Sequence, residues 1–361
     1  MESIFFTDLQ FLILIIGTTS FLVTYILVPI IKGFGERHNI NDIPNNRKLH
    51  TRAIVRLGGV PIFVGFFCGL LSILFTGNFD QFSFENISSY GKIMLFTGSA
   101  IFFLGLFDDL FKLSPKFRLG FQFLVASIAW FNNLRINSVN LEFISSDLNN
   151  VQIPIFISFF ITIIWIAGII NAINWMDGAD GLAIGLLIIA SIAFFIIELP
   201  NDSLYLSCIL SSLIGSALAF LRFNYHPAKI IMGDSGSYFL GFNLSIVSFI
   251  SSADNSTPFD LRVVLLIMFI PIADMVYVIL RRIINGKVPL YPDKTHLHHR
   301  LLESGLNQRE TVNIIWSLSA LFAVIALVID GRISSIFILY SVIIHCICNV
   351  RIRQFLKKLL N

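Results

Sequence analysis

Runs of about 20 consecutive apolar residues recur along almost the whole chain and constrain its fold more than any other feature. Hydrophobic residues make up 56% of the 361 residues and charged residues only 13%, against about a quarter in soluble domains. A window of about 19 residues predicts membrane-spanning helices over residues 9–31, 57–76, 91–107, 119–134, 154–173, 181–199, 204–221, 236–252, 261–280, 311–330 and 333–350. The sequence therefore predicts an all-α polytopic membrane protein with about eleven transmembrane helices and a single integral membrane domain over residues 1–361.

The Lys and Arg residues predict how these helices are oriented, because basic residues are retained on the cytoplasmic side. With the N-terminus outside, all but four of the 25 Lys and Arg residues fall on the inner side. The four outer ones are Lys92, Arg135, Arg262 and Arg332. We expect the N-terminus outside and the C-terminus in the cytoplasm. The net charge of only +3 does not favour a nucleic-acid-binding protein.

Five aspartates lie on the predicted cytoplasmic side in apolar or glycine-rich surroundings: Asp108, Asp109, Asp177, Asp180 and Asp234. A carboxylate deep in hydrocarbon costs roughly 2.5 kcal/mol or more, so the group calls for a positively charged occupant such as a divalent cation. The adjacent pair at 108 and 109 fits a Mg²⁺ site that receives a phosphate or a proton relay in a transporter. It also fits a solvated helix end flanked by Lys112 and Lys116.

A second group repeats every third residue and consists of Asn171, Asn174, Asp177 and Asp180. This spacing along a frayed helix end places two amides and two carboxylates on one side, which suits a polar ligand with many hydrogen-bonding groups. The neighbouring Gly178 and Gly181 allow close backbone approach. Ordinary helix-capping in a turn explains one or two of these residues but not four in register.

A third motif, Met232–Ser237, is glycine-rich and opens an apolar run. Free backbone N–H groups and the helix dipole favour phosphate at such a helix N-terminus. Asp234 would then hold a cation against that phosphate. A plain N-cap by Asp234 or Ser235 is the alternative.

A fourth motif lies in the basic segment 281–310 and contains His296, His298 and His299. A zinc site lacks a nearby cysteine and a fourth ligand, so binding of phosphate or sugar oxygens is the better interpretation. A surface loop is the alternative.

Two further features are weaker. The stretch Asp42–His50, with Lys48, followed by Val55–Pro61, is either a ligand-binding segment or a positively charged flank. Asp274 is an acid inside an apolar run and is therefore a functional candidate, although pairing with Arg281 or Arg282 explains it equally well.

The motifs RLGGVPIF, GLFDDLFKLSPKF, NAINWMDGADGLA, IIMGDSGSYFLG and PDKTHLHHRLLESG occur in this order over nearly the whole chain. Together they resemble the polyprenyl-phosphate N-acetylhexosamine-1-phosphate transferases of glycosyltransferase family 4. The Pro-Asp-Lys-x-His-x-His-His form is similar to the WecA and TagO branch that takes UDP-GlcNAc, which puts the related MraY branch and its phospho-muramoyl-pentapeptide substrate second.

This resemblance implies a Mg²⁺-dependent transfer, with Mn²⁺ as a substitute, of a sugar 1-phosphate from a UDP-sugar to polyprenyl phosphate such as undecaprenyl phosphate. UMP is the other product, and the reaction is the first membrane step of a cell-envelope polysaccharide such as O-antigen, lipopolysaccharide or teichoic acid. The active site is then expected on the cytoplasmic face of the inner membrane, and the protein is expected to form a homodimer.

The resemblance also implies roles for individual residues. Asp108 becomes a base or an organiser of the lipid phosphate, with Asp109 beside it, and Asp234 becomes the metal ligand. The substrate-binding residues are then Asn171, Asn174, Asp177, Asp180, His296, His298, His299 and Lys48. Ile231 departs from the pattern, because some MraY-like members place an aromatic ring for uracil there.

Two alternatives remain open. One keeps the chemistry and changes the donor to another UDP-N-acetylhexosamine or to UDP-MurNAc-pentapeptide. The other is an ion-coupled secondary transporter, which normally places its acids near the bilayer midplane and often has repeated halves. Here the acids map to loop edges and no internal repeat is visible.

Overall fold

The structure is a computed structural model that describes residues 2–43, 52–75, 89–199, 204–253, 259–286 and 295–348. Side chains are described in these ranges except at 2–9, 89, 204, 251–253 and 343–348. Lys48, one of the predicted substrate-binding residues, lies outside the described residues.

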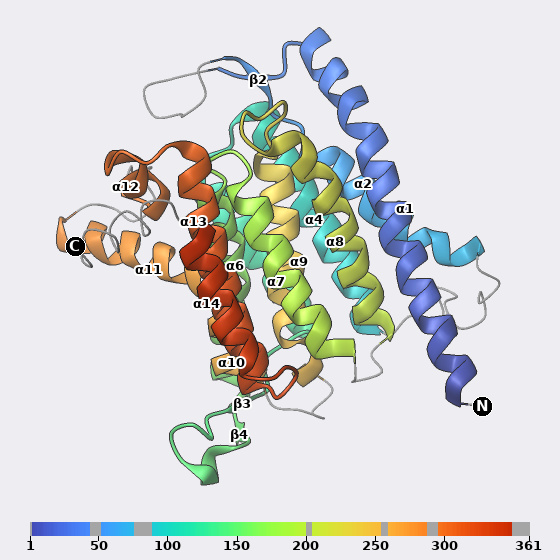
Figure 1. The fold of residues 1–361 in the computed structure, drawn as a ribbon, viewed down its shortest axis with the longest axis vertical. Coiled ribbons are helices and arrows are strands. Elements are labelled where there is room, and N and C mark those ends of the chain that lie inside the picture. The colour runs from blue at the N-terminus through green and yellow to red at the C-terminus, as the bar shows by residue number, and fades with distance from the viewer. Residues whose placement is uncertain are drawn as a thin grey trace.

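Helices dominate the described chain and run mostly side by side (Figure 1). They are α1 (Glu2–Arg37), α2 (Gly59–Leu71), α4 (Ser89–Phe111), α5 (Pro115–Phe131), α6 (Ile155–Met176), α7 (Leu182–Glu198), α8 (Leu204–Asn224), α9 (Gly233–Ala253), α10 (Leu261–Ile267), α11 (Phe269–Ile284), α12 (Leu297–Glu303), α13 (Gln308–Ile329) and α14 (Ile336–Cys348). By length and composition, α1, α4, α6, α8 and α13 can each cross a membrane, and α10 with α11 adds a sixth candidate. The expected all-α polytopic membrane protein is confirmed, whereas the full set of eleven spans stays a prediction.

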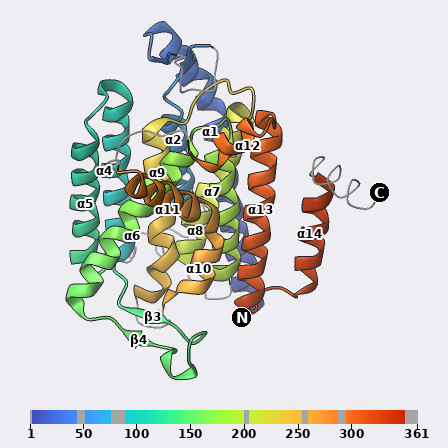
Figure 2. The ribbon, with the colours of Figure 1, turned by 90° about the vertical axis from the view of Figure 1, so that its left-hand side faces the viewer.

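One expected helix is not continuous. The segment 261–280 was predicted as a single span, but α10 and α11 meet at an angle of 83°. Pro271 accounts for the break, because proline has no N–H to donate and its ring clashes with the carbonyl four residues earlier, at Ile267. As a result α11 runs across the bundle while α10 runs along it (Figures 1 and 2).

Helix α9 lies at the centre of the bundle and packs against α2, α4, α6 and α7. Every residue from Met232 to Ile250 is buried. Some of its polar side chains are satisfied within the helix, as where Asn243 donates to the Phe239 carbonyl. Because α9 is surrounded, its N-terminus opens into the middle of one end of the bundle.

Small residues let α1, α2 and α8 approach closely, as is usual for helices packed in a membrane. The Ser20 hydroxyl of α1 donates to the Ser212 carbonyl at 2.7 Å, and the Ser212 hydroxyl donates to the Phe66 carbonyl at 2.7 Å. A Cβ atom at Gly65 of α2 would lie only 1.9 Å from Thr24 Oγ1. These three helices form one tightly packed unit beside α9.

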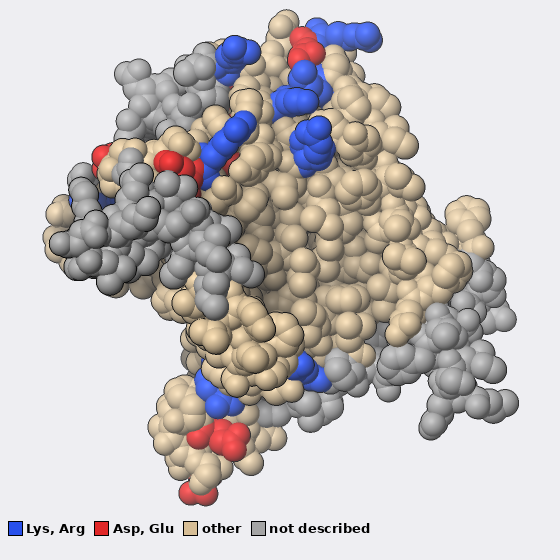
Figure 3. Space-filling view, in the orientation of Figure 1, with Lys and Arg blue, Asp and Glu red and all other residues tan. Residues whose placement is uncertain are grey.

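Two small sheets mark the opposite ends of the bundle (Figure 1). At one end β1 (Asn41–Asp42) pairs antiparallel with β2 (Ile54–Val55). At the other, β3 (Ser138–Asn140) lies between antiparallel β4 (Val151–Gln152) and parallel β5 (Phe259–Asp260). Figure 3 shows Lys and Arg side chains gathered at the β1–β2 end, with a smaller mixed group near β3 and β4.

The packing predicts that Gly65→Ala destabilises the protein, because the added methyl group overlaps Thr24 and the Ser20 carbonyl. Overpacking of this kind costs about 1–3 kcal/mol, measurable as a lower melting temperature in detergent. Gly120→Ala in α5 is the matched control, because nothing lies within 4 Å of its added methyl. Equal melting temperatures for the two variants would contradict the packing described for α1 and α2.

Candidate active site

Three helix ends meet in the middle of the basic end of the bundle: the C-terminal ends of α4 and α6 and the N-terminal end of α9. Asp234 lies in the first turn of α9 and is buried. The Asn174 amide donates to Asp234 Oδ1 at 2.7 Å and to Ser237 Oγ at 2.9 Å. The second and third sequence motifs therefore meet at Asp234.

Asp109 caps the N-terminus of α9 from the neighbouring helix α4. Its Oδ1 accepts a hydrogen bond from the Asp234 N–H at 2.8 Å, and its Oδ2 accepts from the Ser235 N–H and hydroxyl at 2.9 and 2.7 Å. Gly233 has φ of +77°, and a Cβ there would lie 2.6 Å from Asp109 Oδ2. Glycine is therefore required for this close approach, and Asp109 holds the N-terminus of α9.

Asp108 faces a different set of partners. Its Oδ2 accepts from Arg118 at 2.6 Å, and its Oδ1 accepts from the Leu113 N–H at 2.7 Å. The same Arg118 nitrogen lies 3.2 Å from Tyr238 Oη and 3.7 Å from Asp234 Oδ2. The two adjacent aspartates thus have distinct partners, because Asp109 caps α9 whereas Asp108 pairs with Arg118.

Arg56 joins the cluster from the chain just before α2. Its Nε lies 2.9 Å from Asp109 Oδ1, and a terminal nitrogen lies 2.8 Å from Asp234 Oδ2. Burial acts to lower the pKa of this guanidinium, but the carboxylates of Asp234 and Asp109 outweigh burial and raise the pKa above its ordinary value. We define the acid–arginine cluster as Asp108, Asp109, Asp234, Arg56 and Arg118.

Arg118 was missed as a site residue, and Arg56 entered only as part of the RLGGVPIF motif, with no role of its own in the site. The signal was weak, because each lies outside the aspartate motifs and many loop arginines mark only orientation. Arg118 follows Asp108 by ten residues, and Ser114 begins the next helix between them by accepting from the Phe117 N–H. That turn brings Arg118 back onto Asp108.

The asparagine–aspartate group faces Asp234 only in part: Asn174 bonds to it, whereas Asn171 and Asp180 have other partners. Asn171 donates to Gln122 at 2.6 Å and to the Ala167 carbonyl at 2.7 Å. Asp177 caps the C-terminus of α6, and burial raises the pKa of its carboxyl well above the ordinary value.

Asp180 lies beyond the helix, and its carboxylate binds a neighbouring loop. Its Oδ2 lies 2.7 Å from His226 Nδ1 and accepts from the Ala228 N–H at 3.0 Å. It therefore holds the loop between α8 and α9.

The histidine motif lies over the turn between α6 and α7. His298 is 1% exposed, and a Cβ at Gly178 would lie 2.5 Å from His298 Nε2. Burial, followed by the neighbouring His299 and His296, lowers the pKa of His298 to about 3, so its ring is neutral. Neither ring nitrogen has a hydrogen-bond partner in the described part of the chain. The ring of His299 lies 4.3 Å from that of His298.

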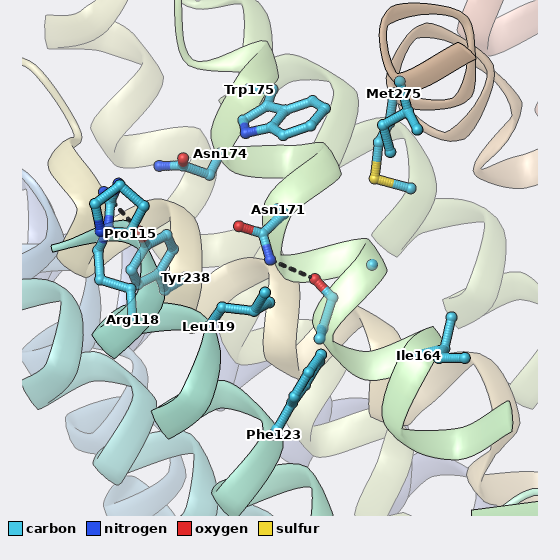
Figure 4. Close-up of a pocket in the computed structure, with 13 residues that line it drawn as sticks. Pro115, Arg118, Leu119, Phe123, Ile164, Asn171, Asn174, Trp175, Tyr238 and Met275 are labelled. Atoms are coloured by element: carbon cyan, nitrogen blue, oxygen red, sulfur yellow. Dashed lines mark hydrogen bonds between the residues drawn. The ribbon is translucent and has the colours of Figure 1, made fainter. Parts of the chain in front are cut away.

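An apolar groove of about 290 Å³ runs up to the cluster between α5, α6, α9 and α11 (Figure 4). Its apolar part includes Phe123 and Leu119 of α5, Ile164 of α6 and Met275 of α11. Arg118, Asn174, Trp175 and Tyr238 form its polar end. The groove thus suits a long apolar molecule with an anionic head.

The donor atoms of the site suit a hard divalent cation. Within the described ranges, no three His, Cys, Asp or Glu side chains form a preformed metal-binding group. Mg²⁺, however, is commonly held by one or two carboxylates together with waters and substrate phosphates. Asp234 and Asp108 each form an ion pair with an arginine, and their carboxylates are oxygen donors of this kind.

Comparison with known proteins identifies the chain's relatives. Residues 92–252 match the family model described as glycosyl transferase family 4. The probable undecaprenyl-phosphate N-acetylglucosaminyl 1-phosphate transferase of Bacillus subtilis is 33% identical over 329 residues, which cover 90% of this chain and 87% of that protein.

Two other relatives are similar over most of their length. The decaprenyl-phosphate N-acetylglucosaminephosphotransferase of Mycobacterium leprae is 29% identical, covering 84% of this chain and 80% of that protein. The undecaprenyl-phosphate alpha-N-acetylglucosaminyl 1-phosphate transferase of Escherichia coli K12 is 28% identical, covering 86% and 82%. The chain belongs to glycosyl transferase family 4, as a relative of the polyprenyl-phosphate N-acetylglucosamine-1-phosphate transferases.

Proposed function

We propose that this protein transfers N-acetylglucosamine 1-phosphate from UDP-GlcNAc to a polyprenyl phosphate such as undecaprenyl phosphate, releasing UMP. The observation that carries the proposal is the position of the acid–arginine cluster at the head of the apolar groove. The names of the relatives in Bacillus subtilis and Escherichia coli support the same lipid and sugar.

The groove supports the lipid assignment. A polyprenyl phosphate has an apolar tail and an anionic head, and the groove has apolar walls and a polar end with Arg118. A phosphate at this end would meet the guanidinium of Arg118 and the hydroxyl of Tyr238, which already lie 3.2 Å apart. Charge-assisted hydrogen bonds from arginine to phosphate are among the stronger polar contacts in proteins. The first isoprene units would lie along Phe123 and Ile164.

The reaction joins one phosphate oxygen of the lipid to the sugar-linked phosphorus of the UDP-sugar. The bond between that phosphorus and the oxygen of the UMP phosphate breaks, and UMP leaves with the electron pair. The products are polyprenyl-diphosphate-sugar and UMP. Such a displacement needs positioning and charge stabilisation rather than a covalent enzyme intermediate, which matches a site built from carboxylates, amides and guanidinium groups.

The protein's own residues divide these tasks. Arg56 and Arg118 supply fixed positive charge beside Asp234. Asp108 orients Arg118 and so organises the lipid phosphate, while Asp109 holds the N-terminus of α9 in place. Asp234, together with Asp108, would hold a divalent cation, Mg²⁺ or Mn²⁺ in its place. The cation would neutralise charge on the diphosphate of the donor.

The donor is expected on the other side of the cluster. The turn that carries Asp177 and Gly178 lies directly below His298, so the second and fourth sequence motifs form one surface. The imidazole groups there and the turn's backbone can hydrogen-bond to diphosphate and sugar oxygens. Another UDP-N-acetylhexosamine or UDP-MurNAc-pentapeptide would use the same arrangement.

The distribution of charge supports an active site on the cytoplasmic face of the inner membrane. Of the four predicted outer basic residues, Arg262 pairs with Asp260 of β5, and β5 pairs with β3 at the end of the bundle opposite the acid–arginine cluster (Figure 1). The acid–arginine cluster lies at the end of the bundle where Lys and Arg side chains gather (Figure 3). Basic residues are retained on the cytoplasmic side of a membrane. The secondary transporter is disfavoured, because the acids occupy helix ends rather than the middle of the spans.

We expect UMP release by purified protein in detergent to require undecaprenyl phosphate, UDP-GlcNAc and Mg²⁺ together. Omitting any one component should reduce the rate to background. Release with a different UDP-sugar but not with UDP-GlcNAc would support the same reaction with that sugar as the donor. No release with any UDP-sugar, together with solute flux into proteoliposomes, would overturn the proposal in favour of a transporter.

Asp234→Asn should reduce metal-dependent turnover by at least about 100-fold, because the amide keeps the shape but loses the charge that holds the cation. Asp330→Asn is the matched control, since Asp330 pairs with Arg332 at the opposite end of the bundle. Full Mg²⁺-dependent turnover by Asp234→Asn would falsify the metal assignment.

The neighbouring aspartates should respond differently to the same substitution. Asp109→Asn introduces an N–H₂ group facing backbone donors of α9, so we expect a loss of about 1–3 kcal/mol in stability and a lower melting temperature. Asp108→Asn retains an acceptor for the Leu113 N–H but loses the charge beside Arg118. It should lower kcat with a smaller change in melting temperature, and the reverse order would contradict these roles.

A further inference from the structure

Asp274 lies on α11 and is buried, although the reaction described above gives it no part. Both of its carboxylate oxygens are engaged by one short segment. Oδ2 lies 2.7 Å from His296 Nδ1, and Oδ1 accepts a hydrogen bond from the Leu297 N–H at 2.6 Å. The carboxylate therefore holds the first histidine of the His-x-His-His motif by its ring and by the next backbone group.

This contact settles which arrangement Asp274 adopts. The sequence left open a pairing with Arg281 or Arg282 on the same helix, but the carboxylate points instead to the histidine motif. His296 is the residue immediately before α12, and Leu297 is its first residue. Asp274 thus caps α12 from a different helix, as Asp109 caps α9.

The contact also determines which ring nitrogen of His296 is available to a ligand. With Nδ1 committed to the carboxylate, only Nε2 of His296 is left to meet a ligand. The ring is further held edge-on to Trp175, with centroids 5.6 Å apart, and parallel to His298 at 5.7 Å. The guanidinium of Arg282, two turns beyond Asp274 on α11, lies 5.2 Å from the Trp175 ring centroid. The orientation of His296 is therefore set by α6 and α11 together.

The break at Met268 makes this possible. It turns α11 across the bundle, so that one helix faces two parts of the site (Figures 1 and 2). Met275 and Ile279 line the apolar groove (Figure 4), while Asp274 holds the histidine motif. Trp175, which contacts His296, also lines the groove.

We propose that Asp274 is a positioning residue that orients His296 and fixes which of its ring nitrogens faces the diphosphate of the donor. This inference rests on the proposed function, in which the histidine motif lies over the donor. Carboxylates that hold the second nitrogen of a functional histidine commonly matter by about 10–100-fold in metal sites. We expect an effect of similar size here.

A double-mutant cycle tests the proposal. The four proteins are the wild type, Asp274→Asn, His296→Gln and the double variant, each assayed for UMP release with UDP-GlcNAc and undecaprenyl phosphate. Asp274→Asn should lower kcat by about 10–100-fold and change KM less. In the His296→Gln background the same substitution should change kcat by less than about twofold, because its target is gone. If the fold-reduction in kcat of the double variant equals the product of the two single-variant reductions, Asp274 acts independently of His296 and the proposal is overturned.

Two further variants separate positioning from folding. Asp260→Asn is the matched control, because Asp260 caps α10, the other half of the broken pair, and holds Arg262 at the opposite end of the bundle. It should leave kcat unchanged. Asp274→Glu retains the carboxylate and should keep more activity than Asp274→Asn. Loss of folded protein in both Asp274 variants, judged by thermal melting, would assign a structural role and overturn the proposal.

Failure of the proposed function would give a different result. If the wild type releases no UMP with any UDP-sugar, the reaction is wrong, and the same four proteins are compared by calorimetric binding of UDP. A loss of UDP-binding free energy in the double variant that is smaller than the sum of the losses in the two single variants would then support the coupling of Asp274 and His296. Additive losses, or none, would contradict it.

Discussion

Two phosphate-bearing molecules cannot be brought together at the edge of a membrane unless their charge is neutralised. A pair of like unit charges 4 Å apart repels by about 4 kcal/mol at an effective dielectric constant of 20. The acid–arginine cluster holds the neutralising charges in place before any substrate binds. Arg56 and Arg118 lie against Asp109, Asp234 and Asp108, so charges of both signs are held in fixed positions. An anionic substrate would meet the guanidinium groups, and a cation would meet the carboxylates.

The cluster depends in turn on the burial of α9. Because α9 is surrounded by other helices, its first backbone N–H groups cannot be satisfied by bulk water. Asp109 accepts from two of them, and this cap fixes where Asp234 lies. The fold and the site are thus coupled through one helix end, and Gly233 makes the close contact sterically possible.

Several parts of this arrangement could be predicted from the sequence, because they depend on local pattern. Apolar runs locate the helices, and the short motifs with Asp108, Asn174, Asp234 and His298 do meet at one end of the bundle. The family resemblance predicted which residue types form the site. Lys48 lies outside the described residues, and the homodimer stays a prediction.

Other parts depend on contacts between distant segments and left no local signal. Asp109 and Ser235 are 126 positions apart, so the cap between them could not be distinguished from a catalytic pair. The sequence predicted that Asn171 to Asp180 lie on one side of a frayed helix end, whereas Asp180 pairs with His226 of a distant loop. The partner of Asp274 depends on an 83° break whose direction the proline does not specify.

We infer that the site moves a phosphate together with the sugar. The most direct test uses UDP-GlcNAc with radioactive phosphorus only at the sugar-linked phosphate, incubated with the protein, undecaprenyl phosphate and Mg²⁺. The label should appear in the lipid product, and the nucleotide product should be unlabelled UMP. Label remaining in UDP, with unlabelled sugar on the lipid, would show transfer of the sugar alone and would contradict phosphate transfer by this site.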